Sequence, residues 1–136
     1  MRVVFDANIW ISYVIGKRLG NFRELLLDPE LHIFTCDELI IEFIEVSTRP
    51  VLQKYIDPKR LDPIFEQLWN YTNKVSISKP LSIAIDPKDD YLLQLCLENN
   101  IEYLITGDKY LLDLIKYHQT KIISYTDFIK LKFGLR

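Results

Sequence analysis

The sequence has little of what marks several large classes of protein. Its only two cysteines, Cys36 and Cys96, are too few and too isolated for a disulfide framework or a zinc site. Apolar runs, such as residues 39–41, are far too short to cross a membrane. A charged residue, Arg2, follows Met1 directly, without the apolar stretch of a secretory signal. We therefore expect a cytoplasmic protein with no membrane association.

An excess of positive charge is missing as well. The chain carries 17 lysines and arginines against 19 aspartates and glutamates, a formal net charge of −2. No general basic field is present, so a nucleic-acid partner would have to be held by a local patch or through metal ions. What the chain does have is 49% hydrophobic residues in a length of 136. That is enough to bury a genuine core, and we expect one domain over residues 1–136.

Short apolar runs alternate with amphipathic segments along the chain. We expect strands at 3–5, 32–36, 74–77, 102–106 and 121–125, the third of them weak and near an edge. We expect helices at 8–15, 21–27, 37–48, 89–99, 110–117 and from 126 onward, where Thr126 would cap the last, with a helical hairpin at about 51–72. This alternation predicts an α/β fold with a parallel sheet and helices on both faces. Residues just after the strands would then meet at one edge of the sheet, where such folds bind ligands.

Four acidic residues fall at that predicted edge. Asp6 directly follows the first strand, Asp108 follows the fourth, Glu42 lies in the helix after the second, and Asp89 begins the helix that leads into the fourth. Asp6 could instead cap the helix beside it, but Asn8 could support such a turn without bringing a charge to the mouth of a buried strand. We therefore interpret Asp6 as a site residue.

Helical geometry separates Glu42 from its acidic neighbours. In the helix at 37–48, an apolar arc faces the core and includes Ile44, while Glu38, Glu42 and Glu45 form an acidic stripe. At about 100° per residue, Glu42 lies about 40° from Val46, closest of the three to the buried arc. We predict that Glu42 leans inward and that the other two glutamates are solvated.

The same construction separates Asp89 from Asp90. Leu93 and Cys96 follow Asp89 at i+4 and i+7, so Asp89 should face the core side of its helix. Asp90 is rotated by about 100° toward the rim, and we expect it to support the site rather than to bind the ion. An acid in the first turn of a helix is also favoured by the helix dipole, which leaves a purely structural role for Asp89 open.

Carboxylates brought together by a fold raise one another's pKa and are tolerated where cations or protons neutralise them. Oxygen ligands without useful cysteine or histidine select hard cations, so we predict a Mg²⁺ or Mn²⁺ site. Asn8 and Thr106 would orient the acids. His32 and His118 are isolated, and we interpret both as structural or surface residues. A divalent ion at this edge suits phosphoryl chemistry, where it activates water and stabilises charge on phosphate oxygens.

These residues resemble the PIN-domain ribonucleases, most nearly the VapC-like toxins of prokaryotic toxin–antitoxin systems. The resemblance covers nearly the whole chain, including residues 122–128. It rests on Asp6-x-Asn8 after the first strand, Glu42 six residues beyond the second, Asp89 with Cys96 seven residues later in a DPKDD context, and TGDKYLL at 106–112. Two positions depart from the family pattern without removing a ligand: Thr35-Cys36 stands where a serine is common, and Cys96 replaces the usual alanine.

The resemblance implies a three-layer α/β/α fold with about five parallel strands in the order 3-2-1-4-5. It implies a Mg²⁺- or Mn²⁺-dependent endoribonuclease in which Asp6, Glu42, Asp89 and Asp108 are the catalytic metal ligands. It further implies inhibition by a cognate antitoxin, a homodimer or higher oligomer, and partner contacts at the helical hairpin. For the RNA substrate, we propose phosphate contacts at Lys17, Arg18, Arg23, Lys88 and Lys109.

Two other classes of function compete with this interpretation. Phosphotransfer through an aspartyl phosphate also places an aspartate after a first strand, but the phosphatase version wants a second aspartate where Asn8 stands. The receiver version wants an acid pair near the first helix, which is absent from the sequence. The other class is a catalytically inactive PIN-like scaffold that binds a protein or RNA partner, and the presence of all four acids argues against it.

Overall fold

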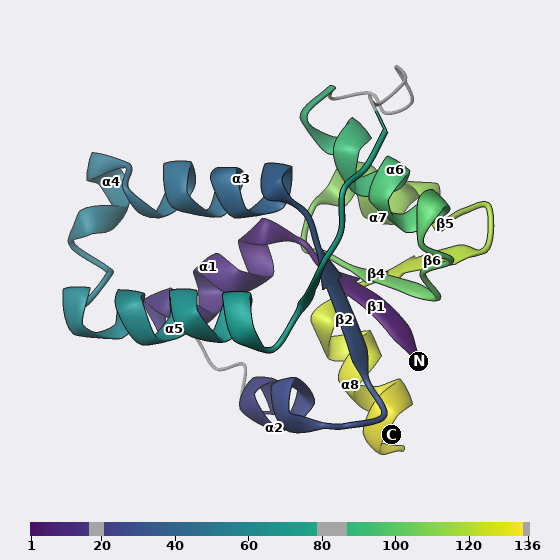
Figure 1. The fold of residues 1–136 in the computed structure, drawn as a ribbon, viewed down its shortest axis with the longest axis horizontal. Helices are drawn as coiled ribbons and strands as arrows, with labels where there is room; N and C mark the ends of the chain where they lie inside the picture. Colours follow the sequence, from purple (N-terminus) through teal and green to yellow (C-terminus); the bar gives the residue numbers. More distant parts are fainter. Residues whose placement is uncertain (17–20, 79–86, 135–136) are drawn as a thin grey trace.

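A six-stranded, mostly parallel sheet forms the centre of the molecule, with helices around it (Figure 1). The computed structural model describes residues 1–16, 21–78 and 87–134. The strand order is β3-β2-β1-β4-β6-β5. The strands are β1 (Arg2–Phe5), β2 (His32–Thr35), β3 (Asn73–Lys74), β4 (Tyr103–Ile105), β5 (Lys116–Tyr117) and β6 (Thr120–Ile123). The predicted order of five parallel strands is confirmed, and an antiparallel sixth strand, β5, is added beside β6.

The apolar runs of the sequence become the buried middle of the sheet. β1 pairs in parallel with β2 on one side and with β4 on the other, where Phe5 aligns with Ile105. Val3 and Val4 are completely buried and Phe5 is almost so. A strand covered on both faces needs apolar side chains in both directions, which explains the unbroken Val-Val-Phe run. β1 and β4 therefore end at the same edge, one residue before Asp6 and Thr106.

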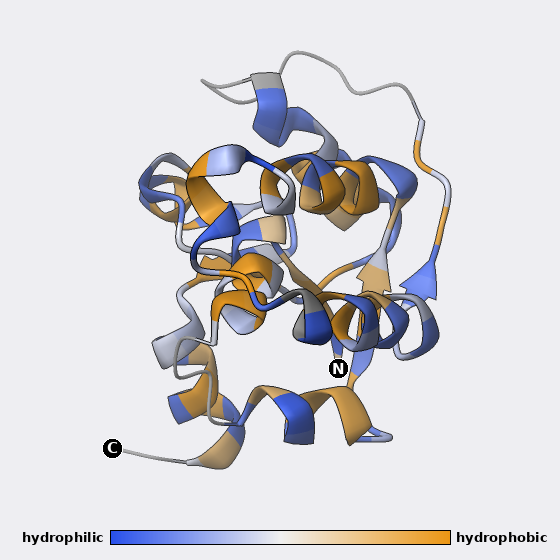
Figure 2. Ribbon diagram, turned by 90° about the vertical axis from the view of Figure 1, so that its left-hand side faces the viewer, coloured by the Kyte–Doolittle hydropathy of each residue, from blue (hydrophilic) through white to orange (hydrophobic). Residues whose placement is uncertain are grey.

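Helices pack around this sheet in groups. They are α1 (Ala7–Ile15), α2 (Phe22–Leu27), α3 (Asp37–Ser47), α4 (Pro50–Gln53), α5 (Pro58–Asn70), α6 (Asp90–Glu98), α7 (Lys109–Leu114) and α8 (Tyr125–Phe133), with a 3₁₀ turn at Pro87–Asp89. α1 contacts both α3 and α5 on one side of the strands, while α6 and α7 lie on the other side in Figure 1. Figure 2 shows hydrophobic and hydrophilic residues alternating along the helices, as expected where one face of each helix packs inward.

The predicted helical hairpin is shifted relative to the sequence pattern. α4 is a single turn that begins at Pro50, one residue before the predicted range of about 51–72, and α5 begins at Pro58 and ends at Asn70. Both helices start at a proline, whose missing N–H costs nothing in the first turn. The Asp57 carboxylate accepts a hydrogen bond from the Lys59 backbone N–H and caps α5. Asp57 therefore fixes the point at which the second helix of the hairpin begins.

Three expected elements differ in detail. The helix predicted over 110–117 is wrong in its last residues, because α7 ends at Leu114, Ile115 takes φ 66°, and a hairpin follows. The third strand is shorter and earlier than predicted, since β3 is only Asn73–Lys74, but it does lie at the sheet edge. α8 is capped by the Ser124 hydroxyl, which accepts from the Asp127 N–H, and not by Thr126.

The histidines and the cysteines differ in their exposure to solvent. His32 and His118 are both exposed, and His118 sits with φ 52° in the tight turn between β5 and β6. Cys36 and Cys96 are buried free thiols. Within the described ranges, no helix is both long and apolar enough to span a membrane.

Candidate functional site

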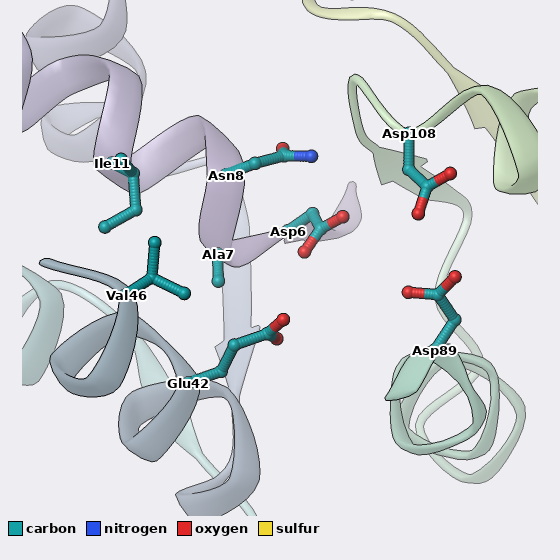
Figure 3. A pocket seen from close by; sticks show the side chains of 8 residues that line it. All are labelled: Asp6, Ala7, Asn8, Ile11, Glu42, Val46, Asp89 and Asp108. Carbon is teal, nitrogen blue, oxygen red and sulfur yellow. The ribbon is translucent and has the colours of Figure 1, made fainter. Parts of the chain in front are cut away.

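The four acids predicted from the sequence line one cavity at the carboxyl edge of the sheet. The cavity has a volume of about 130 Å³. Its walls are Asp6, Ala7, Asn8, Ile11, Glu42, Val46, Asp89 and Asp108. In Figure 3, the carboxylates of Asp6, Glu42, Asp89 and Asp108 reach into it from separate parts of the chain. The fold therefore brings together residues up to about a hundred positions apart, as the strand order predicts.

The Asp6 carboxylate is held by a hydrogen bond from Thr106 and does not cap the helix that follows it. It precedes α1 at the N-cap position, yet its side chain makes no capping hydrogen bond. Instead, its Oδ2 accepts a 2.7 Å hydrogen bond from the Thr106 hydroxyl. The backbone joins the two strand ends as well, because the Asp6 N–H donates to the Ile105 carbonyl at 2.9 Å. Asp6 is thus fixed at the junction of β1 and β4, with only 5% of its surface exposed.

The surroundings of Asp6 disfavour its charged form. Burial raises its pKa from 3.8 to about 6, the hydrogen bond from Thr106 opposes the rise, and the nearby Glu42 and Asp108 carboxylates add to it. Negative charge in this cavity is therefore only partly compensated by the protein. A group in such a position is stabilised by a proton or a cation.

Thr106 connects two of the acids. Its hydroxyl donates to Asp6 and accepts a 3.0 Å hydrogen bond from the Asp108 backbone N–H. Asp108 in turn caps α7, since its Oδ1 accepts from the Tyr110 N–H at 2.8 Å. Asp108 therefore has a structural role and lines the cavity at the same time. The short segment between β4 and α7 therefore positions the Thr106 and Asp108 side chains through hydrogen bonds within a few residues of each other.

Glu42 stands apart from its acidic neighbours as the helical wheel predicts. It is half-buried and lines the cavity, whereas Glu38 and Glu45 are exposed. The phenol of Tyr91 donates a hydrogen bond to Glu42 Oε2. Burial and the neighbouring Glu42 charge raise the pKa of Tyr91, so the phenol remains a donor at neutral pH. One residue of the expected apolar arc does not follow the prediction, because Ile44 is 42% exposed.

Asp89 lines the cavity and Asp90 does not. Asp89 ends the 3₁₀ turn and precedes α6, with 7% of its surface exposed and no side-chain capping bond to that helix. Asp90 was predicted to turn toward the exposed rim, and this is wrong, because Asp90 is as buried as Asp89. The 3₁₀ turn shifts the start of the helix, so a wheel drawn from Asp89 misplaces its first residues.

The other predicted site residues lie at different distances from the acidic cavity, and only some of them line it or adjoin it. Asn8 is exposed and lines the cavity, but within the described residues no hydrogen bond joins its amide to an acid. Arg23 is exposed on α2 and is not among the cavity residues. Lys109 is exposed next to Asp108. Lys17 and Arg18 lie outside the described residues.

A second cavity adjoins the acidic one and shares Glu42 with it. It measures about 360 Å³ and is lined by Glu38, Ile41, Glu42, Glu45, Arg49, Lys88 and Tyr91. Lys88 lines this cavity together with Glu42, and its proposed contact with RNA phosphate stays a prediction. Arg49 and Tyr91 were not among the predicted residues. Their contribution depends on the spacing between α3 and α6, which no local sequence pattern encodes. Ile11 and Val46, the apolar wall of the acidic cavity, were likewise not identified as site residues.

The donor set fits a hard divalent cation. All four acidic residues offer oxygen, and no histidine or cysteine of residues 1–16, 21–78 and 87–134 lines the cavity. The pKa of Asp6 is raised first by burial and then by the neighbouring carboxylates, so its charged form would be stabilised by a bound cation. Among the residues that the structure describes, no three histidine, cysteine, aspartate or glutamate side chains are already grouped tightly enough to hold one ion. Ligation would therefore need the side chains to move together around the ion.

Comparison with known protein families agrees with the fold. The family model described as PIN domain matches residues 2–110, a stretch that contains all four acids. A search of curated proteins returned no match.

Proposed function

The chain belongs to the PIN domain family, and from that premise we propose that it is a divalent-metal-dependent endoribonuclease. PIN domains are generally nuclease domains and generally use divalent metals. The observation that carries the proposal is the convergence of Asp6, Glu42, Asp89 and Asp108 on one cavity. Phosphodiester hydrolysis is the chemistry that such an all-oxygen site serves best.

In the proposed reaction, the four acids would hold Mg²⁺ or Mn²⁺. The ion would supply an activated water and stabilise charge on the phosphate oxygens. Thr106 keeps the Asp6 carboxylate turned into the cavity, and the N-terminal turn of α7 fixes Asp108 through the Tyr110 N–H. The apolar side chains of Ile11 and Val46 close one wall of the cavity. Positive groups must then guide the RNA, and we retain Lys88 and Lys109 beside the acids, with Arg23, Lys17 and Arg18, as proposed phosphate contacts.

We expect purified protein to cleave single-stranded RNA when Mn²⁺ or Mg²⁺ is supplied. EDTA should abolish the cleavage, because oxygen ligands alone cannot activate water without the ion. Product formation on labelled RNA and on matched DNA measures both activity and substrate class. Binding of Mn²⁺, followed by calorimetry, is the accompanying measurement. Absence of cleavage together with absence of metal binding would contradict the proposal and favour a PIN-like scaffold that binds a partner.

We also propose that the protein is the toxin of a toxin–antitoxin pair, inhibited by a cognate antitoxin and able to form a homodimer or higher oligomer. Large apolar side chains are exposed on α3, α4 and α5 and in the loop between the last two, namely Ile44, Val51, Tyr55 and Trp69, at 42–65% of their surface. Figure 1 shows α3, α4 and α5 grouped together at one end of the molecule. Exposed apolar side chains on helices that lie together suit a protein interface, and this end of the molecule is the proposed contact surface.

Co-expression with the product of the adjacent reading frame tests the toxin role. We expect that product to co-purify with the chain and to suppress RNA cleavage, because covering the apolar helices stabilises the complex. Pull-down of the tagged chain and a cleavage assay on the complex are the two measurements. Light scattering on the free chain gives its oligomeric state. A nuclease that is active in the presence of that product, and does not bind it, would instead be a housekeeping enzyme.

A further inference from the structure

The hydrogen bond between Tyr91 and Glu42 joins two helices beside the acidic cavity. The Tyr91 phenol comes from α6 and donates to Glu42 Oε2 on α3. Tyr91 lies two residues after Asp89, so the segment that contributes Asp89 to the cavity also holds Glu42. The ring of Tyr91 packs against the hydrophobic core. Its hydroxyl is therefore carried on a fixed support.

Glu42 needs such a support because it borders two cavities. It lines the acidic cavity of about 130 Å³ and the adjoining one of about 360 Å³. A glutamate side chain has three rotatable bonds, and restricting it costs rotamer entropy that a hydrogen bond must offset. Neighbouring carboxylates also repel its charge. A donor bound to one carboxylate oxygen limits the orientations of the other and lets that oxygen face a cation.

Asp6 is oriented by a hydrogen bond of the same kind. Thr106 donates to one Asp6 oxygen, in the way that Tyr91 donates to one Glu42 oxygen. Groups that hold ligands in this way are worth about 10–100-fold in metal affinity or activity in other metal sites. We propose that Tyr91 is a positioning residue that fixes Glu42 for metal binding. This inference rests on the proposed metal-dependent function.

The variant Tyr91→Phe tests the proposal, because it keeps the packed ring and removes only the hydroxyl. We expect the dissociation constant for Mn²⁺, measured by calorimetry without RNA, to rise about 10-fold or more. In cleavage assays, the Mn²⁺ concentration for half-maximal rate should rise by a similar factor. The rate at saturating Mn²⁺ should stay within a few fold of the wild type, and the KM for RNA should not change. A purely structural role would not produce this split.

Two control variants keep the result interpretable. Tyr103→Phe removes a hydroxyl from a half-buried ring that packs on Phe128, outside both cavities, and should leave Mn²⁺ affinity unchanged. In a Glu42→Gln background, adding Tyr91→Phe should cause no further loss of Mn²⁺ affinity, because both changes remove the same function.

The outcomes separate this inference from the proposed function. If the wild type binds Mn²⁺ and cleaves RNA but Tyr91→Phe binds Mn²⁺ equally well, only the role of Tyr91 is overturned. An equal loss in Tyr103→Phe, or a full further loss in the Glu42→Gln background, overturns it too. A wild type that neither binds Mn²⁺ nor cleaves RNA overturns both this inference and the proposed function.

Discussion

Replacing Asp6 with asparagine should abolish RNA cleavage and, at neutral pH without metal, make the protein more stable. The rate of RNA cleavage should fall by more than about 100-fold. Removing a residue that only supports a metal ligand already lowers metal affinity or activity by about 10–100-fold. The asparagine side chain has nearly the same shape, and its oxygen can still accept from the Thr106 hydroxyl. The substitution removes the negative charge of Asp6. Metal binding requires that charge, but in the absence of metal the buried position disfavours it.

The gain in stability follows from the raised pKa of Asp6. The carboxyl titrates at about 6 in the folded protein against an ordinary value of 3.8. Between about pH 4 and pH 6 the unfolded chain releases its proton first, so the free energy of unfolding falls as the pH rises through this window. Above pH 6 the full penalty is present, on the order of 3 kcal/mol for a shift of about two pKa units. The neutral amide of Asp6→Asn has no proton to release and avoids that penalty.

Urea unfolding in EDTA at pH 4 and pH 7 measures this difference. Asp6→Asn should gain most over the wild type at pH 7 and little at pH 4, with a gain of the order of 1–3 kcal/mol. Asp62→Asn changes an exposed aspartate on α5 and should alter neither activity nor stability appreciably. An Asp6→Asn protein that cleaves RNA at the wild-type rate, or that shows the same stability difference at both pH values, would contradict the prediction.

The positions of the four acids were predictable because local rules determine them. Asp6 and Asp108 follow apolar strands, and the segments that follow neighbouring parallel strands meet at the carboxyl edge of the sheet. Glu42 separates from Glu38 and Glu45 by rotation around a helix, which the sequence specifies directly. The prediction that Asp90 is more exposed than Asp89 was wrong because it assumed α-helical rotation from Asp89 onward. A 3₁₀ turn changes the rotation per residue where the helix begins.

The parts that were missed depend on contacts between distant segments. Nothing near Tyr91 in the sequence indicates that its phenol meets Glu42, 49 residues earlier, because that contact requires α6 to pack beside α3. The β5–β6 hairpin was missed for a different reason. The chain enters the hairpin through Ile115, which ends α7 with a positive φ, and it reverses at His118, which also has a positive φ; such positions ordinarily favour glycine or asparagine. Pairing with β6 holds these residues in a conformation that their own propensities oppose.

α2 carries none of the four cavity acids, yet its Phe22 packs against Phe5, just before Asp6, and against Trp10 in the helix after it. Phe22, at the start of α2, is completely buried. Its ring lies 4.8–6.2 Å, centroid to centroid, from the rings of Phe5, Trp10, Tyr13 and Tyr125. Phe5 directly precedes Asp6, and Trp10 lies in the helix that follows it. The orientation of the strand end at the cavity thus depends on this aromatic cluster.

Phe22→Ala should therefore lower the free energy of unfolding by about 3–5 kcal/mol, through lost burial and the cavity left by the ring. Domains of this size are stable by only about 5–15 kcal/mol, so the variant should also lose Mn²⁺ binding well below the wild-type melting temperature. Urea unfolding measures the first effect, and calorimetry across a temperature series measures the second. Phe133→Ala removes a ring that is 41% exposed on α8, and its cost should be much smaller. Equal losses in the two variants would show that the cluster around Phe22 has no special part in holding the strand that ends at Asp6.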